Sequence, residues 1–220
     1  MLKRFLIGFN HTLVLCVLWG CSKQNDFIQA GNTIIYAHSI DEIAEDLKIS
    51  FKEYGLETLR TELLLNGLAI TEILHQTYKH QSEQAYLDLL LFWDSLDKKK
   101  EINNTIGLYK SWGSETEASI IINGTSPNSL GSNIAAAIAK LEADEWSAPI
   151  KTQYGWALVY LYERKEGMRS RAHVKFHLFP FNIFKNYQVI EAKNLWENAT
   201  LDGTPSLINN LPFEFRNKKR

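Results

Sequence analysis

Three stretches in the first half of the chain repeat hydrophobic residues every three or four positions, over 40–51, 56–78 and 82–99. This spacing places apolar side chains along one face of a helix, so it predicts three helices. Ser39 and, three positions later, Glu42 form a capping-box pattern that predicts the start of the first helix. Amphipathic helices are rarely stable alone, and we therefore expect the three to pack against one another.

The pattern changes after Gly113, where β-branched and alternating stretches replace the helical repeats. It predicts strands over 118–122, 147–152, 156–162 and 172–179, and helices over 133–141 and 187–200. Gly155 lies in the tight turn between the second and third of these strands, where a backbone of positive φ favours glycine. A helical segment followed by mixed strands and helices predicts an α+β fold.

The composition is that of a globular protein, because 45% of the 220 residues are hydrophobic and 22% are charged. The formal net charge is −1, and the basic run at 98–100 is no longer than three lysines. A nucleic-acid-binding protein normally carries a basic patch or stripe, so we expect no nucleic-acid partner.

The first 20 residues have the pattern of an export signal. Lys3 and Arg4 precede a mainly apolar stretch of about 15 residues, which is shorter than the ~20 that cross a membrane. Residues 18–21 then read Leu-Trp-Gly-Cys and resemble the lipobox of bacterial lipoproteins. The resemblance implies a lipid anchor on Cys21, and Ser22 after it favours the outer membrane. The alternative is a short helix with an unmodified Cys21.

Both cysteines, Cys16 and Cys21, lie in this N-terminal part. Residues 22–220 therefore contain no thiol for a disulfide, a cysteine-ligated metal or thiol catalysis. The histidines also give no metal pattern. His173 and His177 are four apart in a predicted strand and would lie ~13 Å from each other. His75 and His80 are five apart near a helix end, and we expect both to be polar surface residues.

The proline-containing stretch at 146–156 is the most informative in the chain and reads Trp-Ser-Ala-Pro-Ile-Lys-Thr-Gln-Tyr-Gly-Trp. With the alanine-rich helix before it, residues 131–165 resemble the C-terminal half of a parvulin-type (PpiC/SurA-like) peptidyl-prolyl cis-trans isomerase domain. The resemblance implies an antiparallel sheet with covering helices, an activity that needs no cofactor or metal, and proline-containing or unfolded polypeptide clients.

This resemblance, together with the export signal, divides the chain into five expected parts. We expect a lipoprotein signal peptide over 1–20, a tether over 21–38, a helical foldase segment over 39–112, a degenerate or truncated parvulin-like domain over 113–203 and an irregular tail over 204–220.

Two positions depart from the family pattern. The family usually has a histidine directly after the Gly-aromatic pair, where this chain has Ala157. The residue pattern typical of the family's first strand comes after the hairpin instead of before it, at 170–176, and includes His173. Residues 170–203 therefore either begin a second, shortened module or supply a strand that completes the sheet of the first. The sequence leaves both interpretations open.

The resemblance also suggests the site residues. It implies His173 and Thr152 as catalytic residues, and we expect the peptide to bind through apolar and aromatic residues of the same sheet. These are Trp146, Ile150, Tyr154, Trp156 and Phe176.

Two functions follow from the sequence. The first is a membrane-anchored, periplasm-facing foldase or chaperone of the parvulin type. Because Ala157 replaces the usual histidine, the sequence leaves open whether it is an active isomerase. The second is a non-catalytic lipoprotein subunit of an envelope or secretion assembly that uses the same fold for protein–protein contact.

Overall fold

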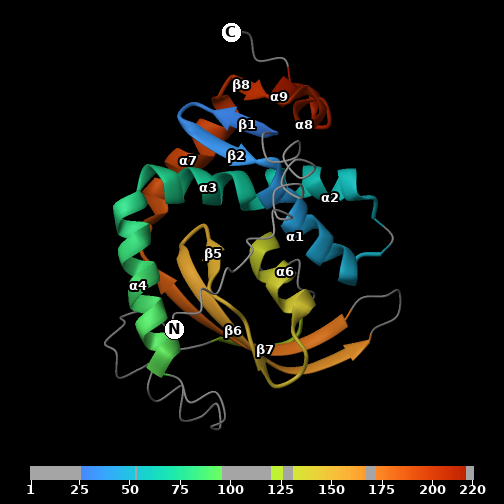
Figure 1. The fold of residues 1–220 in the computed structure, drawn as a ribbon, viewed down its shortest axis with the longest axis vertical. Coiled ribbons are helices and arrows are strands. Elements are labelled where there is room, and N and C mark those ends of the chain that lie inside the picture. Colours follow the sequence, from blue (N-terminus) through green and yellow to red (C-terminus); the bar gives the residue numbers. More distant parts are fainter. Residues whose placement is uncertain (1–25, 53, 96–119, 126–130, 167–171, 217–220) are drawn as a thin grey trace, which may run out of the picture.

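The computed structural model describes residues 26–52, 54–95, 120–125, 131–166 and 172–216, which form an α+β fold as predicted. A three-stranded sheet and a five-stranded sheet lie at opposite ends of the molecule, and helices α1 to α3 lie between them (Figure 1). The described residues contain no helix that is long and apolar enough to cross a membrane.

The small sheet joins the two ends of the described chain. Strand β1 (Phe27–Ala30) pairs antiparallel with β2 (Thr33–Tyr36) on one side and with β8 (Leu201–Gly203) on the other. Residues 27–36, which we expected within a tether, therefore form two strands. Ile28 and Ile35 of these strands are buried in the largest apolar core, which explains the ordered structure.

The first helical region differs from the expectation at its start. Helix α1 (Ala37–Ser50) begins directly after β2, and Ser39 does not cap it. The N–H of Ala37 instead donates to the carbonyl of Asp26 over 2.8 Å, because the chain enters the helix from a strand. The capping-box prediction for Ser39 and Glu42 was wrong for this reason.

The helix expected over 56–78 is present in three consecutive parts. Helix α2 (Leu56–Leu63) continues into a π-helical turn, η1 (Leu64–Leu68), and then into α3 (Ala69–Thr77). Helix α4 (Lys79–Ser95) follows after Tyr78. Leu89 and Phe92 of α4 pack on the five-stranded sheet rather than on α1 and α2. Helix α4 contacts α3, as expected for helical stretches that pack together, and in addition it covers one face of this sheet.

The five-stranded sheet is antiparallel and has the order β3-β7-β6-β4, with β5 also paired to β6. Its strands are β3 (Ile120–Thr125), β4 (Glu145–Trp146), β5 (Ile150–Thr152), β6 (Gly155–Glu166) and β7 (Ala172–Asn182). The register of β6 and β7 runs from Gly155 opposite Asn182 to Glu166 opposite Ala172. Of the two interpretations of residues 170–203, the structure has the second, since β7 completes this sheet.

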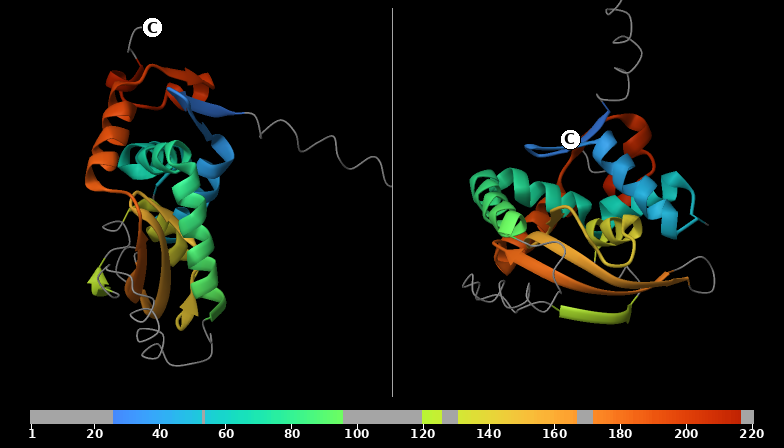
Figure 2. Two further views of the ribbon diagram at one scale, coloured as in Figure 1. Left: turned by 90° about the vertical axis from the view of Figure 1, so that its left-hand side faces the viewer. Right: turned by 60° about the horizontal axis from the view of Figure 1, so that its bottom comes forward.

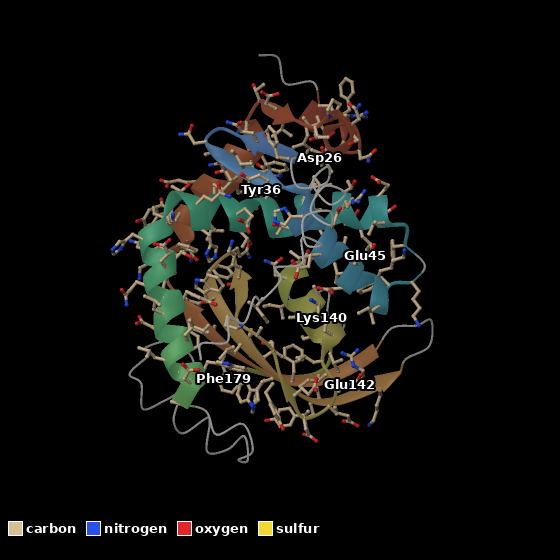
Figure 3. All side chains as sticks on the ribbon, viewed as in Figure 1. Asp26, Tyr36, Glu45, Lys140, Glu142 and Phe179 are labelled. Atoms are coloured by element: carbon tan, nitrogen blue, oxygen red, sulfur yellow. The ribbon has the colours of Figure 1, made fainter. Side chains whose placement is uncertain are left out.

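Two helices cover the faces of the sheet. Helix α6 (Ser132–Lys140) packs Ile134 and Ile138 on Val159 and Phe176. Strand alternation turns Leu158 and Phe179 to the other face, where α4 covers them. Phe179 lies beside the lower part of α4 in Figure 3.

The C-terminal region returns to the small sheet. Helix α7 (Asn186–Asn198) buries Trp196 against the core and leads to β8, and two short helices follow, α8 (Pro205–Ile208) and α9 (Phe213–Arg216). Leu207 and Leu211 are buried in the core, so residues 204–216 do not form the irregular tail that we expected. Figure 2 shows α8 and α9 at the end of the molecule that carries the small sheet, away from the large one.

Candidate functional site

A mainly apolar cleft of about 270 Å³ lies between the five-stranded sheet, the start of α6 and η1, and it is called the proline cleft below after Pro180 in its wall. Its apolar walls come from Leu68 of η1, Ile134 of α6, and Ala157, Leu178 and Pro180 of the sheet. Its polar edge comes from the β5–β6 hairpin, which contributes residues 151–154. The N-terminal helices and the sheet thus build this cleft together.

The floor of the proline cleft is formed by facing residues of two strands. Ala157 of β6 lies opposite Pro180 of β7 in the register, and Ala157 is fully buried. A small methyl side chain at 157 leaves room above the sheet, and Pro180 brings no N–H to the ladder at that point. The floor therefore offers apolar surface and no titratable group at the position where the family usually has histidine.

The tight turn of the hairpin brings Thr152 and Tyr154 to the cleft. The N–H of Tyr154 donates to Oγ1 of Thr152 over 3.3 Å, and the carbonyl of Tyr154 accepts from Ile183 over 2.7 Å. Gly155 closes the turn with a φ of 142°, as predicted from the sequence. A Cβ on Gly155 would lie 2.3 Å from the carbonyl oxygen of Phe181, so no other residue fits this turn.

A buried histidine holds the hairpin from behind. Nε2 of His75, on α3, lies 3.0 Å from the carbonyl oxygen of Thr152 and 3.1 Å from that of Gly155. Since carbonyl oxygens only accept, Nε2 carries the proton, and Nδ1 accepts from the Ser82 hydroxyl at 2.5 Å. These contacts therefore fix the neutral imidazole in one tautomer.

The environment of His75 favours this neutral form. Burial lowers the pKa of His75 below its usual range, and the positive charge of Lys151 lowers it further. The prediction that His75 is a surface residue was wrong. Sequence reasoning missed this residue because its partners on the hairpin lie 77 and 80 positions away.

An ion pair also joins the hairpin to α3. Nζ of Lys151 lies 3.0 Å from Oε1 of Glu72. On the other side of β5, Nδ2 of Asn133 donates to the carbonyl of Lys151 over 2.8 Å. The hairpin is thus held by α3 and α6 at once, which fixes the edge of the proline cleft.

The structure separates the expected peptide-binding residues into two groups. Tyr154 lines the proline cleft and is 42% exposed, and the expected catalytic residue Thr152 lies beside it. Phe176 and Ile150 are instead buried beneath α6, and Ile150 borders a neighbouring cleft.

The two tryptophans lie on the opposite face of the sheet. Nε1 of Trp156 donates to the carbonyl of Ser82 over 3.0 Å, and its ring packs on Tyr86 and His75. Trp146 packs on Trp93. Both rings therefore pack beneath α4 and do not line the proline cleft.

The structure does not bring His173 close to Thr152. The backbone of His173 pairs with Lys165 on β6, whereas Thr152 pairs with Gly155. Ten residues of strand separate the two points, which corresponds to roughly 30 Å. The side chain of His173 and the whole of Cys21 lie outside the described residues. In the part of the chain that is described, no group of three His, Cys, Asp or Glu residues is placed to hold a metal ion.

The comparison with protein families gives one match. Residues 77–169, less than half of the chain, match the model of the PPIC-type PPIase domain. Among curated proteins and among solved structures, no match to the chain was found.

The matched region contains α4, α6 and the β5–β6 hairpin, whereas η1, His75 and β7 lie outside it. The region starts before residue 113, where we placed the beginning of the parvulin-like domain. The proline cleft is therefore bordered on one side by the matched region and on the other by segments that flank it. Over residues 77–169, this chain is similar to the PPIC-type PPIase domain, a parvulin-like prolyl isomerase fold.

Proposed function

We propose that the protein is a foldase that binds proline-containing segments of unfolded polypeptides in the proline cleft and promotes their cis–trans isomerisation. The observation that carries the proposal is the position of this cleft, on the hairpin of the region that matches the PPIC-type PPIase domain. Such a domain implies proline-containing polypeptide substrates.

The walls of the cleft suit this chemistry. The barrier to isomerisation is the ~18–20 kcal/mol of amide resonance, and no nucleophile or cofactor is needed to cross it. An apolar site that holds the proline ring can favour the twisted amide over the planar one. Leu68, Ile134, Ala157 and Leu178 supply such a surface, and the hydroxyl of Thr152 lies at its edge.

With these walls, we expect the cleft to bind polypeptide but to accelerate isomerisation only weakly. Ala157 offers no hydrogen bond to the substrate amide, so the twisted form gains little beyond what the planar form gains. We therefore expect a low isomerase rate together with measurable affinity for unfolded chains. Suppression of aggregation of an unfolded outer-membrane protein is the corresponding chaperone activity.

An experiment on Tyr154 tests the proposal. Isomerisation of a proline peptide is measured by NMR exchange with the wild type, with Tyr154→Ala and with Tyr187→Ala. Tyr187 is a matched control, because it is 60% exposed on α7 and does not line the proline cleft. We expect exchange above the uncatalysed rate for wild type and Tyr187→Ala, and a reduced rate for Tyr154→Ala. A wild type that neither binds the peptide nor accelerates exchange would overturn the proposal.

We further propose that the foldase is attached to the bacterial envelope through a lipid on Cys21, on the periplasmic side and in the outer membrane. The support is the lipobox-like text at 18–21 and Ser22 after the cysteine. Several acyl chains on one residue give durable anchoring, at ~0.8 kcal/mol per buried methylene. Metabolic labelling with palmitate tests the anchor, because Cys21→Ser should lose the label and leave the membrane fraction. A labelled Cys21→Ser chain would contradict it.

A further inference from the structure

The side chain of Asn133 connects the proline cleft to a second cleft. The second cleft, of about 350 Å³, lies between α1, α6 and the connection from β4 to β5. Among the described residues, only Asn133 and Lys151 border both clefts. Lys140, labelled on α6 in Figure 3, pairs with Asp46 at 2.6 Å on the wall of the second cleft. The second cleft is thus more polar than the first.

The orientation of the Asn133 amide is fixed. Its Nδ2 donates to the carbonyl of Lys151 over 2.8 Å. If the amide were turned by half a rotation, Oδ1 would face that carbonyl, and two acceptors would repel each other. The backbone of Lys151 pairs with Trp156 in the β5–β6 ladder, so the carbonyl cannot easily move away. Oδ1 of Asn133 therefore has one defined direction.

That oxygen has no hydrogen-bond partner among the described residues, although it is buried. A buried amide oxygen is normally paired, and an unpaired one on a ligand cleft favours a donor from the ligand. Because this oxygen is covered in the unbound protein, a donor reaches it only when side chains at the boundary between the two clefts, where Asn133 lies, move aside on binding. Asn133 is thus placed to accept a hydrogen bond from a bound chain.

We propose that Asn133 is a substrate-binding residue whose Oδ1 accepts a hydrogen bond from a backbone N–H of the polypeptide. The segment that donates it passes from the proline cleft, over Asn133 and Lys151, into the second cleft. This inference rests on the proposed function and specifies which backbone group of the substrate the cleft recognises.

The chemistry of proline limits which residue of the substrate can donate the hydrogen bond to Asn133. A proline residue has no N–H, so the donor is another residue, and we take the residues directly before and directly after the proline as the candidates. A backbone donor is present whatever the flanking side chain is, with the exception of a second proline. Recognition through Asn133 therefore tolerates many sequences around the proline and excludes consecutive prolines, which suits a foldase with varied clients.

The test removes the donor from the substrate. Three blocked, labelled, alanine-rich peptides with one central proline are compared by fluorescence anisotropy. One has all its amides, and the others carry an ester in place of the amide N–H of the residue before or after the proline. Loss of one hydrogen bond should weaken binding of one of the two ester peptides to the wild type by up to about tenfold.

Variants of Asn133 complete the test. Asn133→Leu and Asn133→Ala should bind the amide peptide more weakly than the wild type and should not distinguish it from the ester peptides. Asn194→Leu is the matched control, because Asn194 is exposed on α7 outside both clefts, and it should discriminate as the wild type does.

The outcomes separate this inference from the proposed function. If the wild type binds all three peptides equally, the role of Asn133 is overturned and the foldase function stands. The same holds if the variants keep the full discrimination. The wild-type comparison needs no variant, so it decides the matter even if a substitution at Asn133 prevents folding. If the wild type binds none of the peptides, both proposals fail.

Discussion

Nε2 of His75 and the carbonyl oxygen of Thr152 are 3.0 Å apart, although 77 positions separate the two residues in the chain. This hydrogen bond joins α3, outside the matched domain, to the hairpin that borders the proline cleft. Through it, the helical segment and the PPIase-like region share one site. The segment therefore both lines the proline cleft, through Leu68, and holds the hairpin at its edge, through His75.

Replacing His75 should loosen the hairpin. His75→Leu leaves two buried carbonyls without their donor, and we expect the free energy of unfolding to fall by about 1–3 kcal/mol. His75→Gln retains an amide donor and should recover part of this loss. Urea unfolding measures both, and affinity for the amide peptide shows whether the cleft edge has moved. Equal stability of His75→Leu and the wild type would contradict the role of this hydrogen bond.

Stability should also depend on pH through His75. Its folded pKa is lowered by burial, so between that value and the unfolded value of about 6.5 only the unfolded chain gains a proton. The free energy of unfolding should therefore fall as the pH drops below about 6.5 and should be constant above it.

Urea unfolding between pH 5 and 7.5 measures this dependence, and His75→Gln should reduce its slope. Burial also lowers the pKa of His177, so His177→Gln serves as the control that accounts for the second histidine. A slope unchanged in His75→Gln would rule out His75 as its source.

The turn glycine gives a sharper stability prediction. Gly155→Ala combines a φ of 142° with a Cβ 2.3 Å from the Phe181 carbonyl oxygen. Gly67→Ala is a close control, because Gly67 has a φ of 125° and a Cβ added there would have nothing within 4 Å. Since an incompatible backbone alone costs about 1 kcal/mol or more, we expect clearly larger destabilisation for Gly155→Ala. If thermal unfolding shows the same loss of stability in both variants, the clash between the added Cβ and the Phe181 carbonyl has no effect on stability.

Restoring the family's usual histidine should raise catalysis. Ala157→His places an imidazole on the floor of the proline cleft, where it can hydrogen bond to a substrate amide. General acid–base groups or hydrogen bonds of this kind can contribute about 10²-fold in rate, so even partial success is measurable. Leu87→His, on the exposed side of α4, is the control. NMR exchange measures the rate, and an unchanged rate with unchanged peptide affinity would show that Ala157 does not limit catalysis.

Local patterns in the sequence predicted the hairpin well. The strands on either side of the turn and the positive φ of Gly155 depend on neighbouring residues, and both are present in the structure. The strand at β1 was missed because Ile28 is buried through pairing with Gly203, which comes from the other end of the chain. Pairing at such a distance leaves no local signal.

The site was predicted only in part for a related reason. Alternation along β6 shows that Trp156 and Ala157 face opposite sides of the sheet. It does not show which side a helix covers. Helix α4 covers the side of Trp156, so Trp146 and Trp156, which we expected to bind peptide, pack internally. The open side carries the small residue Ala157, which the sequence marked only as a departure from the family pattern.

The position of β1 between β2 and β8 sets the order in which the chain can fold. When residues 27–36 leave the ribosome, β1 can pair with β2, but its second neighbour is made about 170 residues later. One edge of β1 therefore stays open until residues 201–203 have been made. The small sheet is then the last of the two sheets to be completed, because every strand of the five-stranded sheet precedes β8 in the chain.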